Sequence, residues 1–588
     1  MLSTPSVPEN DFAVLRDDAS NRWLRFSAPV HAIRANRPSE VVPALHAVGQ
    51  AVERHGFHAV GWIAYEAAPA FDPALRTHAP GPLPLLWFGL HRPPECVNVP
   101  PPPPVNPLLW QSELSAACYA RCFGLVKSHI RQGDSYQVNL TYRLRCAEFS
   151  ADPWQAFLSL IAAQNPAFGA FVSCGPWRIC SASPELFFRL DGQNVVSRPM
   201  KGTAPRGLSS RQDRLLAERL LCSEKNRAEN LMIVDMVRND LGRVSLPGSV
   251  RADTLCSLEK YPAAWQLTST VSAHTNATAC EIFAATFPPA SITGAPKART
   301  MEIIAGLEIS PRQVYSGAVG FIAPGRRAQF NVAIRTLLVD AHDRSAEFGV
   351  GGGVVWDSDN DDERLECRTK ASILHASPPP PFQLIETMLW TPDEGFRLLA
   401  FHLSRLRESA DYFDFPFDGS LVRNALSSLV DSLPRLPSKV RLLLGRDGRP
   451  RLESSPLSPL PSARVAKVAV ARRPVDRRDA FLYHKTTLRS FYEHCRSDFP
   501  RHDDVVLFND SAEATETTIA NLAVEIDGAL CTPPVECGLL PGVARAELLA
   551  RGVLRERIIP LDLLRRNPRI FLLNSVRGLW PAALIDAP

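Results

Sequence analysis

The segment 198–207 holds a lysine in a constrained part of the chain. Two prolines, Pro199 and Pro205, fix the backbone φ angle, and two glycines allow conformations that other residues resist. This composition predicts a rigid loop that presents the functional group of Lys201 in one direction. An isolated Lys-Gly-Thr is more often a surface turn with a solvated lysine, so the segment by itself leaves both interpretations open.

Acidic residues occur in two predicted helical segments downstream. Glu229 lies in a segment from Ser223 to Gly242 whose apolar residues recur at helical spacing. Glu363, Glu366 and Lys370 occupy positions i, i+3 and i+7 after a glycine-rich turn, so a helix would present all three on one face. A charged helical face of this kind is usually only solvent-exposed, so the spacing alone does not indicate a site.

A second set of candidate residues lies in the last third of the chain. It combines Arg405, Lys485 and Glu516 with the segment Leu540–Arg545, which begins with a Pro-Gly turn. Each residue alone is more often part of a loop or a strand end than of a site, so only the combination is informative. Alternating apolar residues beside Asp527-Gly528 predict a β-hairpin in the same region.

Two proline-rich runs divide the chain. Residues 100–104 and 378–381 favour polyproline II conformation and disfavour a packed core element. We predict the main boundary at the second run, because the chain on either side is long enough for its own core. The predicted divisions are a first domain of residues 1–376 (an N-terminal segment 1–99 and a core 106–376), a linker 377–381 and a second domain 382–588.

Two patterns in the first domain predict secondary structure. Val60–Ala68 has the apolar and aromatic composition of a buried strand. Gly133 is expected to end a helix, and alternating apolar residues from Tyr136 to Tyr142 predict a strand after it.

Composition excludes several classes of function. The 588 residues are 45% hydrophobic and 21% charged, with a formal net charge of +4 and no concentrated basic run, so we expect no nucleic-acid partner. Charged residues interrupt the first thirty positions and no apolar run is long enough to span a bilayer, so we expect a cytoplasmic protein without membrane contact. The 13 cysteines include no Cys-x-x-Cys pair, which argues against a disulfide framework or a zinc site.

Several long motifs between Gly61 and Leu374 keep the order and spacing of one enzyme family. They are Ser183–Phe188, Arg198–Gly207, Ser223–Asn230, Val237–Gly242, Phe287–Lys297 and Gly351–Gly353. Together they resemble the chorismate-utilising enzymes, the family of anthranilate synthase and aminodeoxychorismate synthase component I. The resemblance implies an α/β (α+β) fold with large antiparallel sheets and flanking helices. Lys201 stands where aminodeoxychorismate synthases have lysine and anthranilate, isochorismate and salicylate synthases have alanine.

The resemblance implies a role for each matching residue. Lys201 matches the nucleophile that attacks C2 of chorismate, and Glu185 matches the general acid/base. Residues that match Mg²⁺ ligands are Glu229 and Glu366, with Glu363 nearby. Residues that match substrate contacts are Thr293, Tyr315, Arg335, Lys370 and the backbone of Gly351, Gly352 and Gly353. One residue departs from the family: Gln266 stands where many members have histidine, and a glutamine cannot carry a proton.

The C-terminal motifs resemble the fold-type IV pyridoxal-phosphate enzymes, which include branched-chain and D-amino acid aminotransferases and aminodeoxychorismate lyase. The resemblance implies that Lys485 binds the cofactor covalently and acts as the catalytic base, and that Glu516 keeps the pyridine nitrogen protonated. Arg405 and the backbone N–H groups of Val543 and Ala544 match the phosphate ligands.

Together the two resemblances imply a bifunctional enzyme of the folate pathway. Chorismate and ammonia would give 4-amino-4-deoxychorismate, and elimination of pyruvate would then give 4-aminobenzoate. The open alternative is a chorismate enzyme of the anthranilate synthase type joined to a class IV aminotransferase. A second half that is a non-enzymatic interaction domain is disfavoured, because Arg405, Lys485 and Glu516 are all present. Because the sequence contains no Gly-x-Cys-x-Gly elbow, we expect a separate glutamine amidotransferase subunit to supply ammonia. A homodimer through the C-terminal domain is a further expectation.

Overall fold

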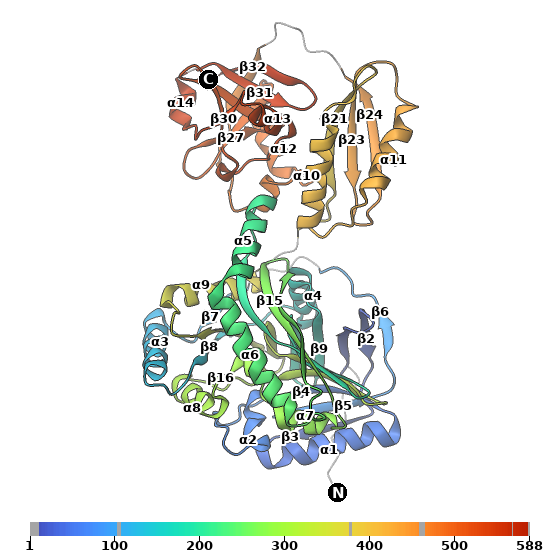
Figure 1. Cartoon of the computed structure of the whole chain (residues 1–588), viewed down its shortest axis with the longest axis vertical. Helices are drawn as coiled ribbons and strands as arrows, with labels where there is room; N and C mark the ends of the chain where they lie inside the picture. Colours follow the sequence, from blue (N-terminus) through green and yellow to red (C-terminus); the bar gives the residue numbers. More distant parts are fainter. Residues whose placement is uncertain (1–10, 103–107, 376–378, 458–464, 567, 586–588) are drawn as a thin grey trace. The chain divides into compact units, whose positions relative to one another are not determined.

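The computed structural model describes residues 11–102, 108–375, 379–457, 465–566 and 568–585. The chain forms two compact units (Figure 1). One contains the described residues of Met1–Arg206 and Ala217–Pro378, and the other contains Gly207–Leu216 with the described residues of Pro379–Pro588. Residues 207–216 therefore group with the second unit, which the sequence did not predict. Parts of both proline runs, including residues 103–104 and 378, lie outside the described residues.

The first unit contains two sheets in which every strand pair is antiparallel. In order across the first sheet the strands are β16 (Gly294–Ala295), β8 (Gln137–Cys146), β20 (Ser345–Val354), β19 (Thr336–Asp340), β10 (Trp177–Ser183), β9 (Phe168–Cys174), β1 (Ala13–Asp17), β2 (Arg22–Phe26) and β6 (Glu95–Val97), and β7 (Gln111–Ser112) also pairs with β8. The second sheet has β13 (Met200–Pro205), β15 (Ala264–His274), β12 (Asn194–Arg198), β11 (Leu186–Asp191), β18 (Arg327–Val332), β17 (Ala318–Ala323), β4 (His58–Ile63), β5 (Leu86–His91) and β3 (His31–Ala35), and β14 (Arg251–Lys260) also pairs with β15.

Helices flank these sheets. They are α1 (Pro38–His55), α2 (Ala68–Phe71), α3 (Ala116–Arg131), α4 (Pro153–Gln164), α6 (Glu224–Gly242), α7 (Ala279–Thr286), α8 (Lys297–Leu307) and α9 (Asn360–Ala371), with short 3₁₀ turns at Tyr65–Ala67, Ala290–Ile292 and Ser372–Leu374. Helix α5 (Ser210–Cys222) has residues in both units. Helix α6 lies across β13, β14 and β15 (Figure 1). The core between the two sheets includes Leu15, Trp62, Val172 and Phe321.

The N-terminal segment is part of both sheets. Strand β1 pairs with β9 and strand β4 pairs with β17, so residues before the first proline run complete the same sheets as the catalytic motifs. Residues 59–63 of β4 are buried on both faces, which requires neighbours on both sides. The segment 1–99 is therefore not a separate body.

The secondary structure agrees with most local predictions. The strand predicted at Val60–Ala68 is β4, but it ends at Ile63, and a 3₁₀ turn follows. Helix α3 ends at Arg131 before Gly133, whose φ is 79°, and β8 follows as predicted. Helix α6 is confirmed; the Ser223 hydroxyl caps it by accepting the backbone N–H of Asn226.

The second unit contains a four-stranded and an eight-stranded sheet. The first has the order β22 (Gly395–Phe396), β21 (Leu384–Thr391), β23 (Ser438–Leu444) and β24 (Pro450–Pro456), with helices α10 (Leu399–Tyr412) and α11 (Gly419–Val430). The second has the order β27 (Ala514–Thr517), β26 (Asp504–Phe508), β25 (Ala466–Val470), β32 (Gly578–Leu584), β31 (Ile570–Asn574), β28 (Asn521–Ile526), β29 (Ala529–Thr532) and β30 (Arg555–Glu556). The remaining helices are α12 (Ser490–Ser497), α13 (Val543–Ala550) and α14 (Leu561–Arg565), with 3₁₀ turns at Ala480–Leu482 and Val535–Cys537.

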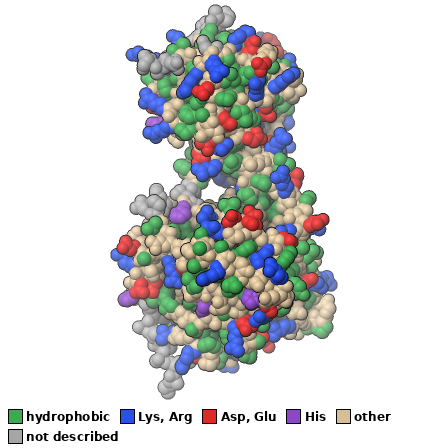
Figure 2. Space-filling view, turned by 90° about the vertical axis from the view of Figure 1, so that its left-hand side faces the viewer, with side chains coloured by type: hydrophobic (Ala, Val, Ile, Leu, Met, Phe, Trp, Pro, Cys, Tyr) green, Lys and Arg blue, Asp and Glu red, His purple; other side chains and the backbone are tan. Residues whose placement is uncertain are grey.

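The predicted hairpin is β28–β29. Asp527 and Gly528 both have positive φ angles, 52° and 77°, as a two-residue hairpin turn requires. Among the described residues, none of the helices is both long and apolar enough to cross a membrane. On the face shown in Figure 2, basic and acidic side chains are interspersed, in line with the small formal charge.

Candidate active sites

Lys201 lies on a bulged strand at the first candidate site. The prediction of a loop is wrong for Met200–Pro205, because these residues form β13 and pair with β15. The register shifts between Met200 and Thr203, where Gly202 has a φ of 97°. The bulge allows consecutive residues from Met200 to Thr203 to line one cavity of about 150 Å³.

The cavity brings together most of the predicted first-site residues. Its lining includes lysine side chains, carboxylates from α6, from α9 and from the loop before β11, and the glycine-rich end of β20. The predicted residues that line it are Glu185, Lys201, Glu229, Tyr315, Arg335, Gly351, Gly353, Glu363, Glu366 and Lys370. The helix face predicted from Glu363, Glu366 and Lys370 is formed by α9.

Thr293 and Gly352 are not part of the lining. The Thr293 side chain is fully buried, and its hydroxyl donates to the carbonyl oxygens of Pro289 (3.3 Å) and Ala290 (3.2 Å). Successive residues of a strand face opposite sides of the sheet, so Gly352 faces the side opposite to Gly351 and Gly353. A β-carbon at Gly352 would lie 2.6 Å from Glu363 Oε2, the end of a flexible side chain.

The glycine-rich end of β20 leaves backbone groups available to the cavity. Pairing with β19 stops at Phe348, whereas β20 continues to Val354 with β8 as its partner on the other edge. Lys370 Nζ donates to the carbonyl oxygen of Gly351 on this stretch (2.8 Å). The arrangement fits the binding of a polar substrate against the strand edge.

The amine of Lys201 faces the same glycine strand, beside a residue that the sequence analysis missed. A β-carbon at Gly353 would lie 2.5 Å from both Lys201 Nζ and Gln137 Nε2, so the two nitrogens lie within twice that distance of each other. Gln137 is fully buried, and both of its side-chain polar atoms lack a hydrogen-bond partner among the described residues. The available signal was a glutamine near the start of the strand predicted from Tyr136 to Tyr142.

Burial separates the proton affinities of the carboxylates in the cavity. Burial raises the pKa of Glu185 to about 7, against the opposing charge of Lys201. Burial also raises the pKa of Glu229 and of Glu363. Burial acts in the same direction on Glu366, but the Lys370 ammonium 2.7 Å away outweighs it and holds the pKa of Glu366 below its usual value.

Arg335 is a buried cation with little local compensation. It has a φ of 51°, and burial lowers the pKa of its guanidinium to about 10. It donates long hydrogen bonds to Gln164 Oε1 (3.4 Å) and the Lys370 carbonyl (3.5 Å). Such a guanidinium is suited to a bound carboxylate.

The carboxylates fit a magnesium ion only with additional ligands. The described residues contain no group of three or more His, Cys, Asp or Glu side chains arranged to hold a metal. However, Glu363 Oε2 is buried without a hydrogen-bond partner there, while its other oxygen accepts the Ser358 hydroxyl (2.7 Å). Mg²⁺ usually takes one or two carboxylates and keeps several waters, so Glu229, Glu363 and Glu366 fit that pattern.

Gln266, the residue that departs from the family, also lines the first cavity. It is 5% exposed on β15, opposite Thr203 of β13. The Thr203 hydroxyl donates to Gln266 Oε1 (2.9 Å). This bond uses the amide oxygen and leaves the amide nitrogen as the donor for the cavity.

The second candidate site is a cavity of about 520 Å³ in the second unit. It brings together Arg405 from α10, Lys485 from the loop before α12, Glu516 from β27 and Val543 at the first turn of α13. Ala544 is buried next to Val543 but is not part of the lining. Arg405, Lys485, Glu516 and Val543 were all predicted from the sequence.

The lysine and the glutamate of this cavity have strongly shifted proton affinities. Burial, with the nearby charges of Arg405 and Arg489, lowers the pKa of Lys485 to about 8. Burial raises the pKa of Glu516 to about 8, although it accepts hydrogen bonds from the Tyr492 hydroxyl (3.1 Å) and Asn521 Nδ2 (3.2 Å). The site therefore holds an amine and a carboxyl whose pKa values both lie near neutral pH, as is typical of groups that take part in proton transfer.

Arg405 is fixed by a buried carboxylate. Glu386 accepts from Arg405 Nε (2.8 Å) and Nη2 (2.6 Å) and also contacts His402 Nδ1 (2.6 Å). Although burial opposes it, Arg405 and His402 lower the pKa of Glu386 to about 2. The remaining Nη1 donates to the Pro541 carbonyl (3.1 Å) in the turn before α13.

These residues fit pyridoxal phosphate. A β-carbon at Gly542 would lie 1.8 Å from Asn521 Oδ1, so only glycine allows the start of α13 to approach this closely. The helix start and Arg405 provide donors for a phosphate, and the buried Lys485 and Glu516 provide an amine and a carboxyl for the ring. Arg489 and Tyr492 also line this cavity and were missed, because nothing in their local sequence separates them from an ordinary helix start.

Comparison with protein families divides the chain at the linker predicted at residues 377–381. The family described as chorismate binding enzyme matches residues 95–376, and the family described as amino-transferase class IV matches residues 383–585. "Aminodeoxychorismate synthase component 1" of Salmonella typhimurium is 41% identical over 269 residues, which are 45% of this chain and 59% of that protein. "Anthranilate synthase component 1 1" of Haloarcula marismortui is 38% identical over 276 residues, 47% of this chain and 56% of that protein. The chain thus spans less than two thirds of the length of these relatives.

A solved structure is similar to the first unit. Anthranilate synthase component I from Streptococcus pneumoniae matches with a TM-score of 0.53 and 22% identity, over 64% of this chain and 94% of that one. At this identity the likeness concerns the fold alone. It agrees with the antiparallel sheets and flanking helices described above.

Proposed function

Because the chain joins a chorismate-binding enzyme domain to a class IV aminotransferase domain, we propose that it converts chorismate and ammonia to 4-aminobenzoate and pyruvate in two steps. The single observation that carries the proposal is the position of Lys201, whose amine faces a cavity lined by Glu185, Arg335 and the carboxylates of α6 and α9. The second domain then has a substrate, since the product of the first step is the compound that a lyase of its family consumes.

In the first unit, Arg335, Tyr315 and the edge of β20 would bind the enolpyruvyl carboxylate of chorismate. A magnesium ion held by Glu229, Glu366 and Glu363 would neutralise the ring carboxylate. Lys201 Nζ forms a bond to C2 as the C4–O bond breaks, and protonated Glu185 gives its proton to the departing hydroxyl, which leaves as water. Ammonia then bonds to C4, and the C2–N bond breaks to release Lys201.

In the second unit, Arg405 and the start of α13 would hold the phosphate of pyridoxal phosphate, and Glu516 would bond to its ring nitrogen. Once bound, the cofactor supplies a sink for the electron pair of a broken C–H bond. Lys485 Nζ, with a pKa of about 8, takes the proton from C4 of 4-amino-4-deoxychorismate. Loss of the C3 substituent as pyruvate makes the ring aromatic.

The alternative is an anthranilate synthase-type enzyme joined to a true aminotransferase. Relatives with both names have similar identity to this chain, so Lys201 is the feature that favours the first reading. The purified chain, loaded with pyridoxal phosphate, should release pyruvate from supplied 4-amino-4-deoxychorismate. Transfer of an amino group from branched-chain or D-amino acids to 2-oxoglutarate, without pyruvate release, would support the alternative.

The pH dependence of the first step tests Glu185. An acid must be protonated to act, so its contribution is present below its pKa of about 7 and is lost as the pH rises through that value. Because the other ionisations are common to the wild type and Glu185→Gln, we expect the ratio of their kcat/KM values for chorismate, measured at constant free ammonia, to fall about tenfold per pH unit above that point. The slow residual reaction of Glu185→Gln should lack this inflection, and an unchanged profile would exclude Glu185 as the acid.

The source of ammonia is the next prediction. We propose that a separate glutamine amidotransferase provides it, because the 588 residues contain no Gly-x-Cys-x-Gly elbow. The purified chain should use ammonium salts but not glutamine as the nitrogen donor. Efficient glutamine-dependent turnover without an added protein would contradict this.

A further inference from the structure

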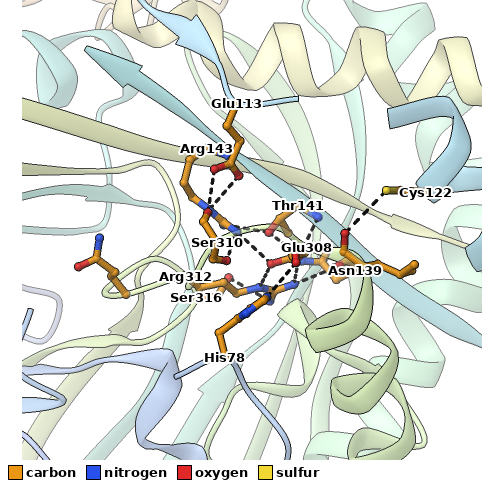
Figure 3. Close-up of polar contacts among 12 residues, drawn as sticks. His78, Glu113, Cys122, Asn139, Thr141, Arg143, Glu308, Ser310, Arg312 and Ser316 are labelled. Carbon is orange, nitrogen blue, oxygen red and sulfur yellow. Dashed lines mark hydrogen bonds and ion pairs between the residues drawn. The ribbon is translucent and has the colours of Figure 1, made fainter. Parts of the chain in front are cut away.

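A buried network of charged side chains, Arg143, Glu308 and Arg312, lies next to Asn139, which lines the first cavity (Figure 3). Glu308 accepts from Arg143 Nη2 (2.9 Å) and from Arg312 Nε (3.0 Å) and Nη2 (2.7 Å). It also accepts from the backbone N–H (3.0 Å) and hydroxyl (2.7 Å) of Thr141 on β8. The side chains of the three charged residues are at most 1% exposed, and none of them is part of the cavity lining.

Arg312 connects this network to the wall of the cavity. Its Nη1 donates to the carbonyl oxygen of Ile292 (2.9 Å) and its Nη2 donates to that of Asn139 (2.8 Å). Ile292 and Asn139 both line the cavity, from a 3₁₀ turn and from β8. One guanidinium therefore holds two separate wall segments at fixed directions.

The third wall segment is the turn that carries Tyr315. Arg312 begins this turn, and its Nη1 reaches the Ser316 hydroxyl at 3.4 Å. Gln313 and Ser316 have positive φ angles, 54° and 63°, which residues other than glycine adopt at a cost in free energy. Glu66 holds the same turn by accepting the backbone N–H groups of Arg312 (2.6 Å) and Gln313 (2.9 Å).

The Tyr315 ring has no room to adjust. A β-carbon at Gly349 of β20 would lie 2.2 Å from the ring, and the Arg143 guanidinium lies 5.6 Å from the ring centroid on the network side. The ring is thus packed between β20 and the charged network, so a shift of the turn would move the ring within the cavity.

We propose that Arg312 is a positioning residue of the first active site: it fixes Asn139, Ile292 and the Tyr315 turn in the geometry that binds chorismate. The inference rests on the proposed function of the first unit. Arginine suits this role because its planar fork directs several donors at once, whereas a lysine is a point charge with flexible directions. Stability alone does not require the network, since buried ion pairs add little over packed apolar residues.

The test compares Arg312→Lys with a matched variant, Arg326→Lys, in the full-length chain. Arg326 also donates to several backbone carbonyls, those of Gly192, Thr275, Asn276 and Ala277, but these residues are not part of the cavity lining. We expect KM for chorismate to rise about tenfold or more in Arg312→Lys and to stay near the wild-type value in Arg326→Lys. Pyruvate release from supplied 4-amino-4-deoxychorismate should be unchanged in both.

The possible outcomes separate the two proposals. A wild-type chain that does not convert chorismate would refute the proposed function. If the wild type is active but KM for chorismate is the same in Arg312→Lys as in Arg326→Lys, the positioning role of Arg312 is overturned. If Arg312→Lys does not fold, as judged by circular dichroism, Glu308→Gln takes its place because it keeps the shape of the acceptor: the same rise in KM supports the inference, and an unchanged KM overturns it.

Discussion

Lys201→Ala is expected to lower the rate of 4-amino-4-deoxychorismate formation by more than about a hundredfold, because the step that bonds C2 to the lysine is lost. Arg335 and the α9 carboxylates remain in place, so chorismate should still bind. The measurement is chromatography of the 4-amino products after incubation with chorismate, ammonium and Mg²⁺, together with a binding titration of chorismate.

Lys201→Arg is the matched control for this experiment. Arginine keeps the positive charge at the cavity but is not a nucleophile at neutral pH. It should bind chorismate and be as inactive as the alanine variant. Undiminished product formation by either variant would exclude Lys201 as the nucleophile.

Lys485→Ala is expected to stop pyruvate release, again by more than about a hundredfold, and to make 4-amino-4-deoxychorismate accumulate. Synthesis of the intermediate should continue at the wild-type rate, because the cavity of the first unit contains no residue of the second. Lys467→Ala, which removes an exposed lysine of β25 outside the second cavity, should behave as wild type.

A covalent label gives an independent readout for the same residue. Borohydride reduction of the wild-type chain with pyridoxal phosphate should fix the mass of the cofactor on the peptide that contains Lys485. Label on a different lysine, or pyruvate release by Lys485→Ala at the unmodified rate, would refute its assigned role.

The sequence predicted those features of the sites that depend on residue type and local spacing. Helical spacing placed Glu363, Glu366 and Lys370 on one face, and α9 does direct all three to one cavity. The Asp527-Gly528 turn was predictable because few residues adopt two consecutive positive φ angles.

The features that were missed depend on contacts between distant segments. Met200–Pro205 was expected to be a loop, but β15 supplies its backbone hydrogen bonds, and no local pattern reveals that partner. The position of Gln137 beside Lys201 depends on the pairing of β8 with β20. Thr293 likewise contacts a cavity residue only through its backbone: its carbonyl oxygen accepts the N–H of Asn139 on β8 (2.8 Å).

The buried network around Glu308 also could not be predicted from local sequence. Glu308 and Arg312 are four residues apart and read as an ordinary helical ion pair, yet their donors and acceptors reach β8 and the 3₁₀ turn at Ile292. Whether such an ion pair lies at the surface or organises buried segments depends on its burial. Its burial depends on the packing of the two sheets, which local sequence does not reveal.

The most direct test of the two-step reaction is incubation of the purified chain with chorismate, ¹⁵N-ammonium, Mg²⁺ and pyridoxal phosphate. Products would be identified by mass and by the ring carbon that carries the ¹⁵N-amino group. We predict ¹⁵N-labelled 4-aminobenzoate and an equal amount of pyruvate, both dependent on Lys201 and Lys485. Labelled 2-aminobenzoate as the product, or a 4-amino intermediate that the second unit never converts, would contradict the proposed function.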